Sequence, residues 1–436
     1  MTKYPKYKPT NIEWIKNIPA HWELRKLKYI VNDKLMYGAN EIAESENPIN
    51  PRYIRITDFG DDGNLRKDTF KSLASDIAKD FLLCEGDILF ARSGATVGKT
   101  FQFKNYNGIA CFAGYLIKAS PNILKINSDY LYYYTKSGTY ENWKNSIFNQ
   151  STIQNIGADK YSLLEISIPP LQEQTLIANF LDEKTEKIDK LIETKKKLIE
   201  LLKEERTAII NNAVTKGMNP KAKLKPSGIE WLGDIPEHWE VKKLKYVAKI
   251  NLGKMLTNDD KGDFHLKPYL RAANLQWLEV DVNDIKEMWF SSWELEKLRL
   301  FENDLLVSEG GEVGRTAIWK NEIEECYIQN SVHKVTILNP NISKFFLFQF
   351  YVNGQKGIFD SIVNRISIAH LTVEKIREII FLVPNYIEQK EIVEFIEAKT
   401  QKIDITISKI EKEIELMKEY RTSLVSEVVT GKVKVF

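Results

Sequence analysis

The chain has 436 residues, of which 43% are hydrophobic and 28% are charged, and its formal net charge is only +2. This balance fits a chain with two or more folded domains and excludes a strongly basic nucleic-acid protein, so any DNA contact must come from local patches. The sequence contains no apolar run of about 18 residues and no apolar signal-peptide core near its start. We therefore expect a cytoplasmic protein that does not contact a membrane.

Cysteine and histidine usage gives no indication of a metal or disulfide framework. The three cysteines show no C-x-x-C spacing, and the five histidines are not spaced like metal ligands. We expect no metal and no cofactor, and we expect the cysteines to lie in hydrophobic cores.

An internal repeat divides the chain into two halves. Thirteen of 22 positions are identical between Pro9–Ile30 and Pro226–Val247, which share the pattern I-E-W-x3-I-P-x-H-W-E-x2-K-L-K-Y. Looser matches follow in the same order along both halves, pairing Tyr53–Arg55 with Tyr269–Arg271, Glu85–Thr100 with Glu302–Thr316 and Ile168–Gln174 with Val383–Gln389. A repeat of this length indicates two copies of one structural unit.

Each half ends in a segment with the heptad pattern of a helix that packs along another helix. From Gln172 to Lys216 the predicted apolar seam is Ile177, Leu181, Ile188, Leu191, Leu198, Leu202 and Ile209, interrupted by Lys184, Lys195 and Glu205. From Ile387 to about Thr430 it is Ile392, Ile396, Ile403, Ile407, Ile410, Met417, Leu424 and Val428. At about 1.5 Å per residue the first helix would be roughly 65 Å long. A helix of that length needs a partner, and the second segment supplies one.

Within each half, short β-rich runs alternate with turns and helical pieces, which predicts an α+β fold. The runs are Tyr53–Thr57, Asp87–Ala91, Tyr115–Ala119, Asp304–Ser308 and Val332–Leu338. We predict a first domain over residues 1–170, a long helix over 171–216, a linker over 217–226, a second domain over 227–384 and a second long helix over 385–432. If the helices form an antiparallel intramolecular coiled coil, the chain returns to the first domain and a pseudo-two-fold axis relates the halves.

This order of elements and several motifs resemble the specificity (S) subunit of type I restriction-modification enzymes. The motifs are EGDILFARSGATVGKT, IPPLQEQTLIANFLDEKTEKID, RTAIINNAVTKG and RTSLVSEVVTGKVKV, and the resemblance covers essentially the whole chain. It implies two target-recognition domains and two spacer helices that fix the gap between two DNA half-sites. It also implies a non-catalytic subunit whose partners are double-stranded DNA, two methyltransferase (M) subunits and restriction/translocase (R) subunits.

The two halves depart from each other at two of the motifs that carry the resemblance. Glu309 stands where the first half has Arg92 and Ser93, and Pro384-Asn-Tyr replaces Pro-Pro-Leu before the second helix. We expect these changes to affect which bases are read and how subunits are contacted. Similar scaffolds with divergent loops predict two different half-sites and hence an asymmetric, split target.

Base edges are read by polar and basic side chains on loops. The candidates for DNA contact are Arg55, Arg92, Ser93, Lys99, Asn149, Gln150, Ser151, Thr152, Arg271, Asn274, Arg315, Asn364 and Arg365. The candidates for contact with other subunits are Gln172, Glu173, Gln174, Lys184, Glu388, Gln389 and Lys399.

Two other hypotheses remain open. Residues 94–100, GATVGKT, look like a phosphate-binding loop, which would suggest a nucleotide-hydrolysing enzyme, but only three residues separate the glycines where the Walker pattern has four. The preferred interpretation is a basic, glycine-flanked loop near DNA, and a tight turn after a buried strand is the simpler alternative. No methyltransferase signature is present, and the nuclease-like Glu-x-Lys triplets lie on the predicted coiled-coil helices, where charged pairs are expected on the surface. The remaining alternative is a coiled-coil adaptor that binds proteins and no DNA.

Overall fold

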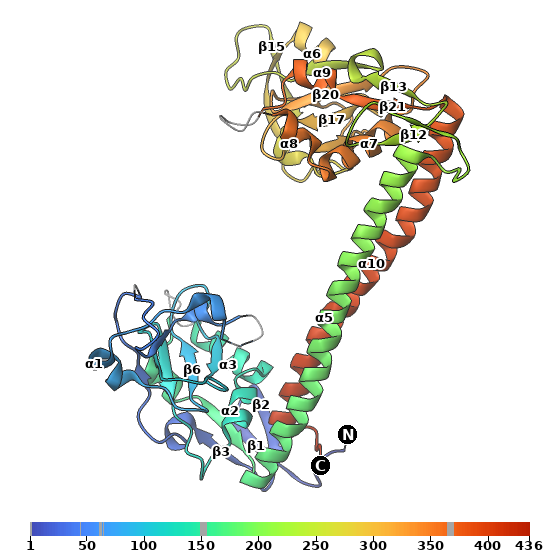
Figure 1. The fold of residues 1–436 in the computed structure, drawn as a ribbon. Helices are drawn as coiled ribbons and strands as arrows, with labels where there is room; N and C mark the ends of the chain where they lie inside the picture. Colours follow the sequence, from blue (N-terminus) through green and yellow to red (C-terminus); the bar gives the residue numbers. More distant parts are fainter. Residues whose placement is uncertain (1, 44, 61–62, 64, 149–154, 364–369) are drawn as a thin grey trace. The chain divides into compact units, whose positions relative to one another are not determined.

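The computed structural model describes residues 2–43, 45–60, 63, 65–148, 155–363 and 370–436 (Figure 1). The chain forms two compact units, one of residues 1–196 with 411–436 and the other of residues 197–410. Each unit contains an α+β domain and part of both long helices. The chain therefore returns to the first unit at its C-terminal end, and the backbone amide of Lys434 donates to the carbonyl of Thr2 at 2.8 Å.

The first unit is built around an antiparallel sheet in the order β4-β9-β6-β7, with three smaller pairs: β1 with β2, β3 with β10, and β5 parallel to β8. Its strands are β1 (Tyr7–Ile12), β2 (Ile15–Pro19), β3 (Glu23–Lys26), β4 (Met36–Tyr37), β5 (Arg52–Ile54), β6 (Ile88–Ala91), β7 (Thr100–Gln102), β8 (Ala110–Phe112), β9 (Leu116–Ala119) and β10 (Glu165–Ile168). Its helices before the long one are α1 (Ser75–Ala78), α2 (Ser128–Tyr134), α3 (Gly138–Phe148) and α4 (Ala158–Ser162).

The second unit repeats this plan with the sheet order β14-β20-β17-β18. Its strands are β11 (Leu224–Pro226), β12 (Asp234–Pro236), β13 (Glu240–Lys243), β14 (Ala248–Leu252), β15 (Phe264–Leu270), β16 (Lys286–Ser291), β17 (Leu305–Ser308), β18 (Thr316–Ile318), β19 (Tyr327–Ile328), β20 (Val332–Ile337) and β21 (Ile380–Val383). Its short helices are α6 (Ser292–Leu298), α7 (Ser343–Gln355), α8 (Ile358–Ile362) and α9 (Val373–Glu378). Strand β15 is longer than β5 and pairs with β16 as well as β19.

The two long helices predicted from the heptad pattern are α5 (Leu171–Lys216) and α10 (Tyr386–Val429) (Figure 1). Helix α5 follows two prolines and ends before Gly217, whose φ of 70° suits the left-handed position after a helix. The start of α5 shares a core with the end of α10 in the first unit, and the end of α5 shares one with the start of α10 in the second. The helices therefore pack antiparallel.

The predicted seam of α5 was wrong in the middle of the helix, although Ile177 and Leu181 at its start are buried as predicted. Leu191 and Leu198 are 46% and 43% exposed, whereas the residues that follow them, Ile192 and Ile199, are 7% and 6% exposed. Thr185 and Arg206 likewise take the places predicted for Lys184 and Glu205. Adjacent Leu-Ile pairs made both registers possible in the sequence. The seam predicted for α10 is correct, and Thr400, Ile414 and Arg421 extend it.

The cysteine prediction was partly wrong. Cys111 and Cys326 are buried as expected, but Cys84 is exposed. Among the described residues, no helix carries an apolar stretch that could cross a membrane, and no cluster of His, Cys, Asp or Glu is arranged to hold a metal ion.

Candidate nucleic-acid interface

Equivalent loops follow the central buried strands of the two sheets. All residues of β6 and β17 are buried, and each strand leads into a loop that turns at two glycines of positive φ. These are Gly94 and Gly98 in the first unit and Gly311 and Gly314 in the second. A side chain added at Gly94 or Gly311 would meet no atom within 4 Å. Each loop therefore faces open space at its first glycine, whereas its second glycine packs against the domain, Gly98 against Lys144 and Gly314 against Phe359.

Three backbone amides of the first loop are used within the chain and do not point at a ligand. The backbone amides of Val97, Gly98 and Lys99 donate within the chain, to the carbonyls of Gly94, Ala91 and Thr96 at 2.9–3.0 Å. A phosphate-binding loop needs such amides to point at its ligand. The geometry is that of a tight turn, and the Lys99 side chain is exposed on it.

Arg92 and Glu309 are the first residues of these loops, and both are half-buried. The Arg92 guanidinium lies 4.8 Å from the centre of the Tyr37 ring, and its Nη1 is 3.5 Å from the Gly114 carbonyl, at the limit of a hydrogen bond. Burial raises the pKa of the Glu309 carboxyl, while nearby His370 acts against this shift. Ser93 is half-buried beside Arg92 and forms an isolated bridge with Asn155.

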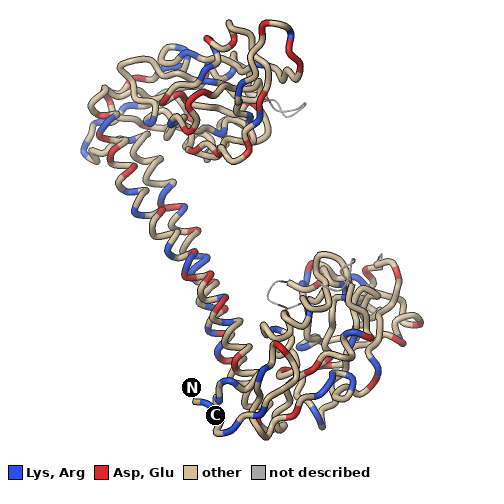
Figure 2. Tube along the Cα trace, turned by 180° about the vertical axis from the view of Figure 1, so that it is seen from behind, with Lys and Arg blue, Asp and Glu red and all other residues tan. Residues whose placement is uncertain are grey.

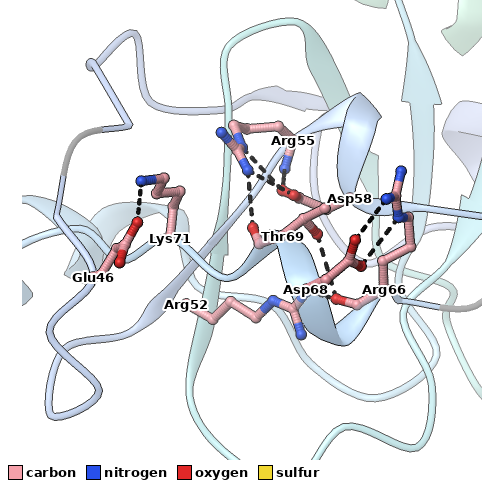
Figure 3. Close-up of polar contacts among 8 residues, drawn as sticks. All are labelled: Glu46, Arg52, Arg55, Asp58, Arg66, Asp68, Thr69 and Lys71. Atoms are coloured by element: carbon pink, nitrogen blue, oxygen red, sulfur yellow. Dashed lines mark hydrogen bonds and ion pairs between the residues drawn. The ribbon is translucent and has the colours of Figure 1, made fainter. Parts of the chain in front are cut away.

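Arg55 is braced by a buried carboxylate (Figure 3). Its guanidinium binds both oxygens of Asp58, at 3.1 Å from Nε and 2.7 Å from Nη2, and Nη2 also donates to the Thr69 carbonyl at 2.9 Å. The hydrogen bonds to Asp58 raise the pKa of Arg55 above its usual value. Because Asp58 is wholly buried, this pair holds the turn after β5 together, and only part of the guanidinium faces solvent.

Further basic residues lie beside Arg55 in Figure 3, and the sequence reading missed them. Arg52 is buried and donates from Nη2 to the Arg66 carbonyl at 2.6 Å, while Lys71 pairs with Glu46 at 2.5 Å. The sequence did mark Arg52 as a difference between the two halves, because the repeat aligns it with Pro268.

The second unit places three candidates around the equivalent turn. Arg271 pairs with Asp284, and Arg315 pairs with Glu312 at 3.2 Å and donates to the Ala272 carbonyl at 3.2 Å. Asn274 is buried, and its amide donates to the carbonyls of residues 281 and 284 at 3.0 and 3.1 Å. Arg271 and Arg315 are partly accessible, whereas the burial of Asn274 favours a structural role.

The remaining DNA-contact candidates, Asn149, Gln150, Ser151, Thr152, Asn364 and Arg365, lie outside the described residues. Lys136, which the sequence reading missed, lies beside the first loop. Its Nζ donates to the Thr100 carbonyl at 2.5 Å and lies 4.7 Å from the centre of the Tyr132 ring. Burial, together with the charges of Arg421 and Lys99, lowers its pKa to about 8. No local sequence signal could have brought Lys136 and Arg421 together.

Four candidates for subunit contact form hydrogen bonds within their own units, and the two units show equivalent bonds. Glu173 accepts from Trp22 Nε1 at 3.0 Å and lies 2.8 Å from His21 Nε2, and Glu388 has the same distances to Trp239 and His238. Gln174 and Gln389 are buried, and each donates to the carbonyl five residues earlier, at 2.8 and 2.9 Å. The two glutamates attach the start of each long helix to the H-W motif of its domain, and the two glutamines fix the chain just before each helix.

The other three candidates lie on helix surfaces. Gln172 and Lys399 are exposed and Lys184 is half-buried. Lys184 and Lys399 occupy equivalent positions, and each ammonium lies over the ring of the Phe four residues earlier, at 5.6 and 5.8 Å. Figure 2 shows that Lys and Arg alternate with Asp and Glu along these helices and form no continuous basic stripe.

Comparison with known proteins identifies the family. The type I restriction modification DNA specificity domain matches the chain twice, over residues 19–203 and 236–416. The MjaVIII specificity subunit of Methanocaldococcus jannaschii is 25% identical over 432 residues, covering 96% of this chain and 94% of that protein. The EcoKI specificity subunit of Escherichia coli K12 is 30% identical over 184 residues, 42% of this chain and 37% of that protein.

Solved structures show the same fold. A chain from a study of complex assembly and conformational transition of the type I R-M system superposes with a TM-score of 0.74 at 13% identity, covering 95% of this chain and 99% of that one. The HsdS subunit from Thermoanaerobacter tengcongensis gives a TM-score of 0.54 at 13% identity, covering 95% and 98%. The chain belongs to the type I restriction-modification specificity subunits, the non-catalytic subunits that recognise the DNA target.

Proposed function

We propose that each domain of this subunit reads its own half-site, so that the complete target is split and asymmetric. The observation that carries this proposal is the contrast between a repeated scaffold and divergent loops. The Glu-His-Trp attachment recurs with the same distances in both units. The loops after β6 and β17 nevertheless differ in length and charge. Two readers of one design with different surfaces fit two different sequences.

We further propose that DNA contact comes from the partly accessible members of the candidate set in each domain. These are Arg55, Arg92, Ser93 and Lys99 in the first domain and Arg271 and Arg315 in the second. Asn149, Gln150, Ser151, Thr152, Asn364 and Arg365 stay predicted contacts. Because Asn274 is buried, we assign it support of the turn that carries Arg271.

Assembly with two methyltransferase subunits and with restriction/translocase subunits is the second part of the proposal. The exposed or half-buried helix residues Gln172, Lys184 and Lys399 are available for this contact. Glu173, Gln174, Glu388 and Gln389 would act by positioning the helix ends, since their side chains are engaged within the chain.

A binding experiment separates this function from that of a protein-only adaptor. The chain, together with its methyltransferase subunit, is titrated against genomic DNA fragments in gel shifts at several salt concentrations. We expect sequence preference that persists as salt rises, because base contacts add to the salt-dependent phosphate contacts. Binding without sequence preference at every salt concentration would favour the adaptor.

A further inference from the structure

Arg92 and Glu309 occupy the same backbone position in the two domains. The amide of Arg92 donates to Tyr115 and its carbonyl accepts from Ile156, at 3.0 and 2.9 Å. The amide of Glu309 donates to Ser331 and its carbonyl accepts from Leu371, at 2.9 and 2.8 Å. Each residue follows the last residue of a buried central strand and precedes a turn whose first glycine, Gly94 or Gly311, faces open space. The chain thus presents opposite charges at one position of one scaffold.

These two side chains also lack ionic partners among the described residues. Arg55 is paired with Asp58, Arg271 with Asp284 and Arg315 with Glu312. In contrast, no described carboxylate pairs with Arg92, and Glu309 forms no ion pair with a described cation, although the charge of nearby His370 favours its ionised form. The Nε of Arg92 is buried without a hydrogen-bond partner in the described chain, as are the Nε atoms of Arg52, Arg271 and Arg315, so the missing ion pair is what distinguishes Arg92 from Arg271 and Arg315. A charged group held in this way at a loop base has unused hydrogen-bonding capacity.

The chemistry of base edges gives each group a different match in the major groove. A guanidinium only donates, and guanine presents two adjacent acceptors, N7 and O6. A carboxylate only accepts, and cytosine presents the N4 amino group. Adenine also has an amino group, but its N7 acceptor lies beside it and would repel a carboxylate. Thymine offers an acceptor and a methyl group, which match neither side chain fully.

A carboxylate on a DNA-facing loop is otherwise unfavourable, since phosphates repel it. Residues 92–99 carry two positive charges, Arg92 and Lys99, whereas residues 309–315 carry Glu309, Glu312 and Arg315, a net charge of −1. Glu312 is already engaged by Trp277 Nε1 at 2.5 Å and by Arg315. These contacts account for the presence of Glu312 in the loop, whereas Glu309 has no contact of this kind with the described residues.

We propose that Arg92 and Glu309 are equivalent specificity-determining residues, with Arg92 selecting guanine in one half-site and Glu309 selecting cytosine in the other. This assignment rests on the proposed function, because it requires each loop to enter the groove of its half-site. Under this assignment, the two half-sites differ in part because the two domains carry opposite charges at one equivalent position.

Glutamine substitutions test this assignment at both positions. The amide of Gln pairs with N6 and N7 of adenine, and Glu309→Gln changes almost no volume. The full-length variants are expressed with their methyltransferase subunit, and methylated positions are mapped across the genome. We expect Glu309→Gln to replace cytosine by adenine at one base pair of one half-site. We expect Arg92→Gln to replace guanine by adenine in the other, and each preference to shift by roughly 5- to 150-fold.

Two further variants separate specificity from folding. Glu302→Gln makes the same charge change at an exposed position just before β17 and should leave the methylated sequence as in the wild type. Arg92→Lys should keep guanine with reduced methylation, since Lys also donates to O6 and N7. Thermal unfolding of each variant accompanies the mapping.

The outcomes distinguish the assignment from the function beneath it. If the wild-type motif is interrupted and Glu309→Gln leaves it unchanged, the proposed role of Glu309 is overturned. If Arg92→Gln weakens methylation uniformly and guanine is retained, Arg92 is a phosphate contact and not a base contact. A wild-type complex with no interrupted motif would instead overturn the proposed function, and this assignment with it.

Discussion

Arg206 and Asp404 form an ion pair between α5 and α10 in the second unit, with Nε and Oδ1 3.0 Å apart. Arg421 and Asp189, which are their equivalents in the repeat, form the same pair in the first unit, also at 3.0 Å. The arginines occupy seam positions, and their partners lie at the edge of the helix pair. The repeat therefore extends to individual contacts of the long helices and fixes their antiparallel register twice.

These ion pairs should contribute little to stability, because both carboxylates are largely exposed. We expect Arg206→Ala and Arg421→Ala each to lower the free energy of unfolding by no more than about 1 kcal/mol. Since they lie in separate units, the effects should add in the double variant. Urea denaturation checks this. A loss above about 3 kcal/mol from one substitution would show that the pair is critical for helix packing.

The attachment of α5 to its domain should depend on Glu173. Trp22 is wholly buried and donates from Nε1 to this carboxylate. Glu173→Ala leaves a buried donor without a partner, so we expect a loss of about 1–3 kcal/mol in unfolding free energy. Gln172→Ala, at the exposed neighbouring position, is the control and should change it by less than about 0.5 kcal/mol. Equal effects of the two substitutions would contradict this role.

Arg55 should stabilise the first domain, whatever its contribution to DNA binding. Arg55→Ala leaves buried Asp58 without its cation, and we expect a loss of about 3 kcal/mol. Arg66→Ala removes the exposed pair with Asp68 and should cost less than about 1 kcal/mol. Denaturant unfolding of both variants measures the difference. An unchanged stability of Arg55→Ala would refute the structural role and leave DNA contact as the reason for this residue.

Lys136 should make stability depend on pH in the alkaline range. Its pKa is about 8 in the folded chain and 10.5 by reference, so between these values the unfolded chain binds a proton that the folded chain does not. The contribution of Lys136 to the free energy of unfolding therefore rises as pH increases from about 8 to 10.5. The difference in unfolding free energy between wild type and Lys136→Met should increase over that range. A constant difference would contradict the lowered pKa.

The long helices should act as a ruler between the half-sites. Inserting one heptad after Lys195 and another after the equivalent Ile410 keeps both seams in register and lengthens the pair by about 10 Å. We expect the gap between half-sites to grow by about three base pairs, or recognition to be lost, with the bases of each half-site unchanged. Mapping of methylated sites gives the answer. Altered half-site bases with an unchanged gap would contradict the spacer role.

The sequence allowed prediction of the domain plan because repeats and heptads are local patterns. The pairing of α5 with α10 followed from the repeat, but the α5 seam did not follow fully, since Leu191 and Ile192 are equally apolar and only packing distinguishes them. The Arg55–Asp58 brace shows the same limit at the candidate site. An arginine on a turn is a plausible DNA contact in sequence, and its buried partner is visible only in the fold.

Lys136 and Arg421 illustrate what no sequence pattern could supply. They are far apart in the chain, and the return of α10 to the first unit brings their charges into interaction. The Arg92–Glu309 substitution, in contrast, was visible as a departure between the repeats. The matching backbone hydrogen bonds, which only the fold shows, establish that the two positions are equivalent.

The most direct test of the account is genome-wide mapping of methylated adenines in the host with and without this gene. We predict one interrupted motif that depends on the gene, with two different parts and a fixed gap. A continuous motif, two identical parts, or methylation that persists without the gene would contradict the account.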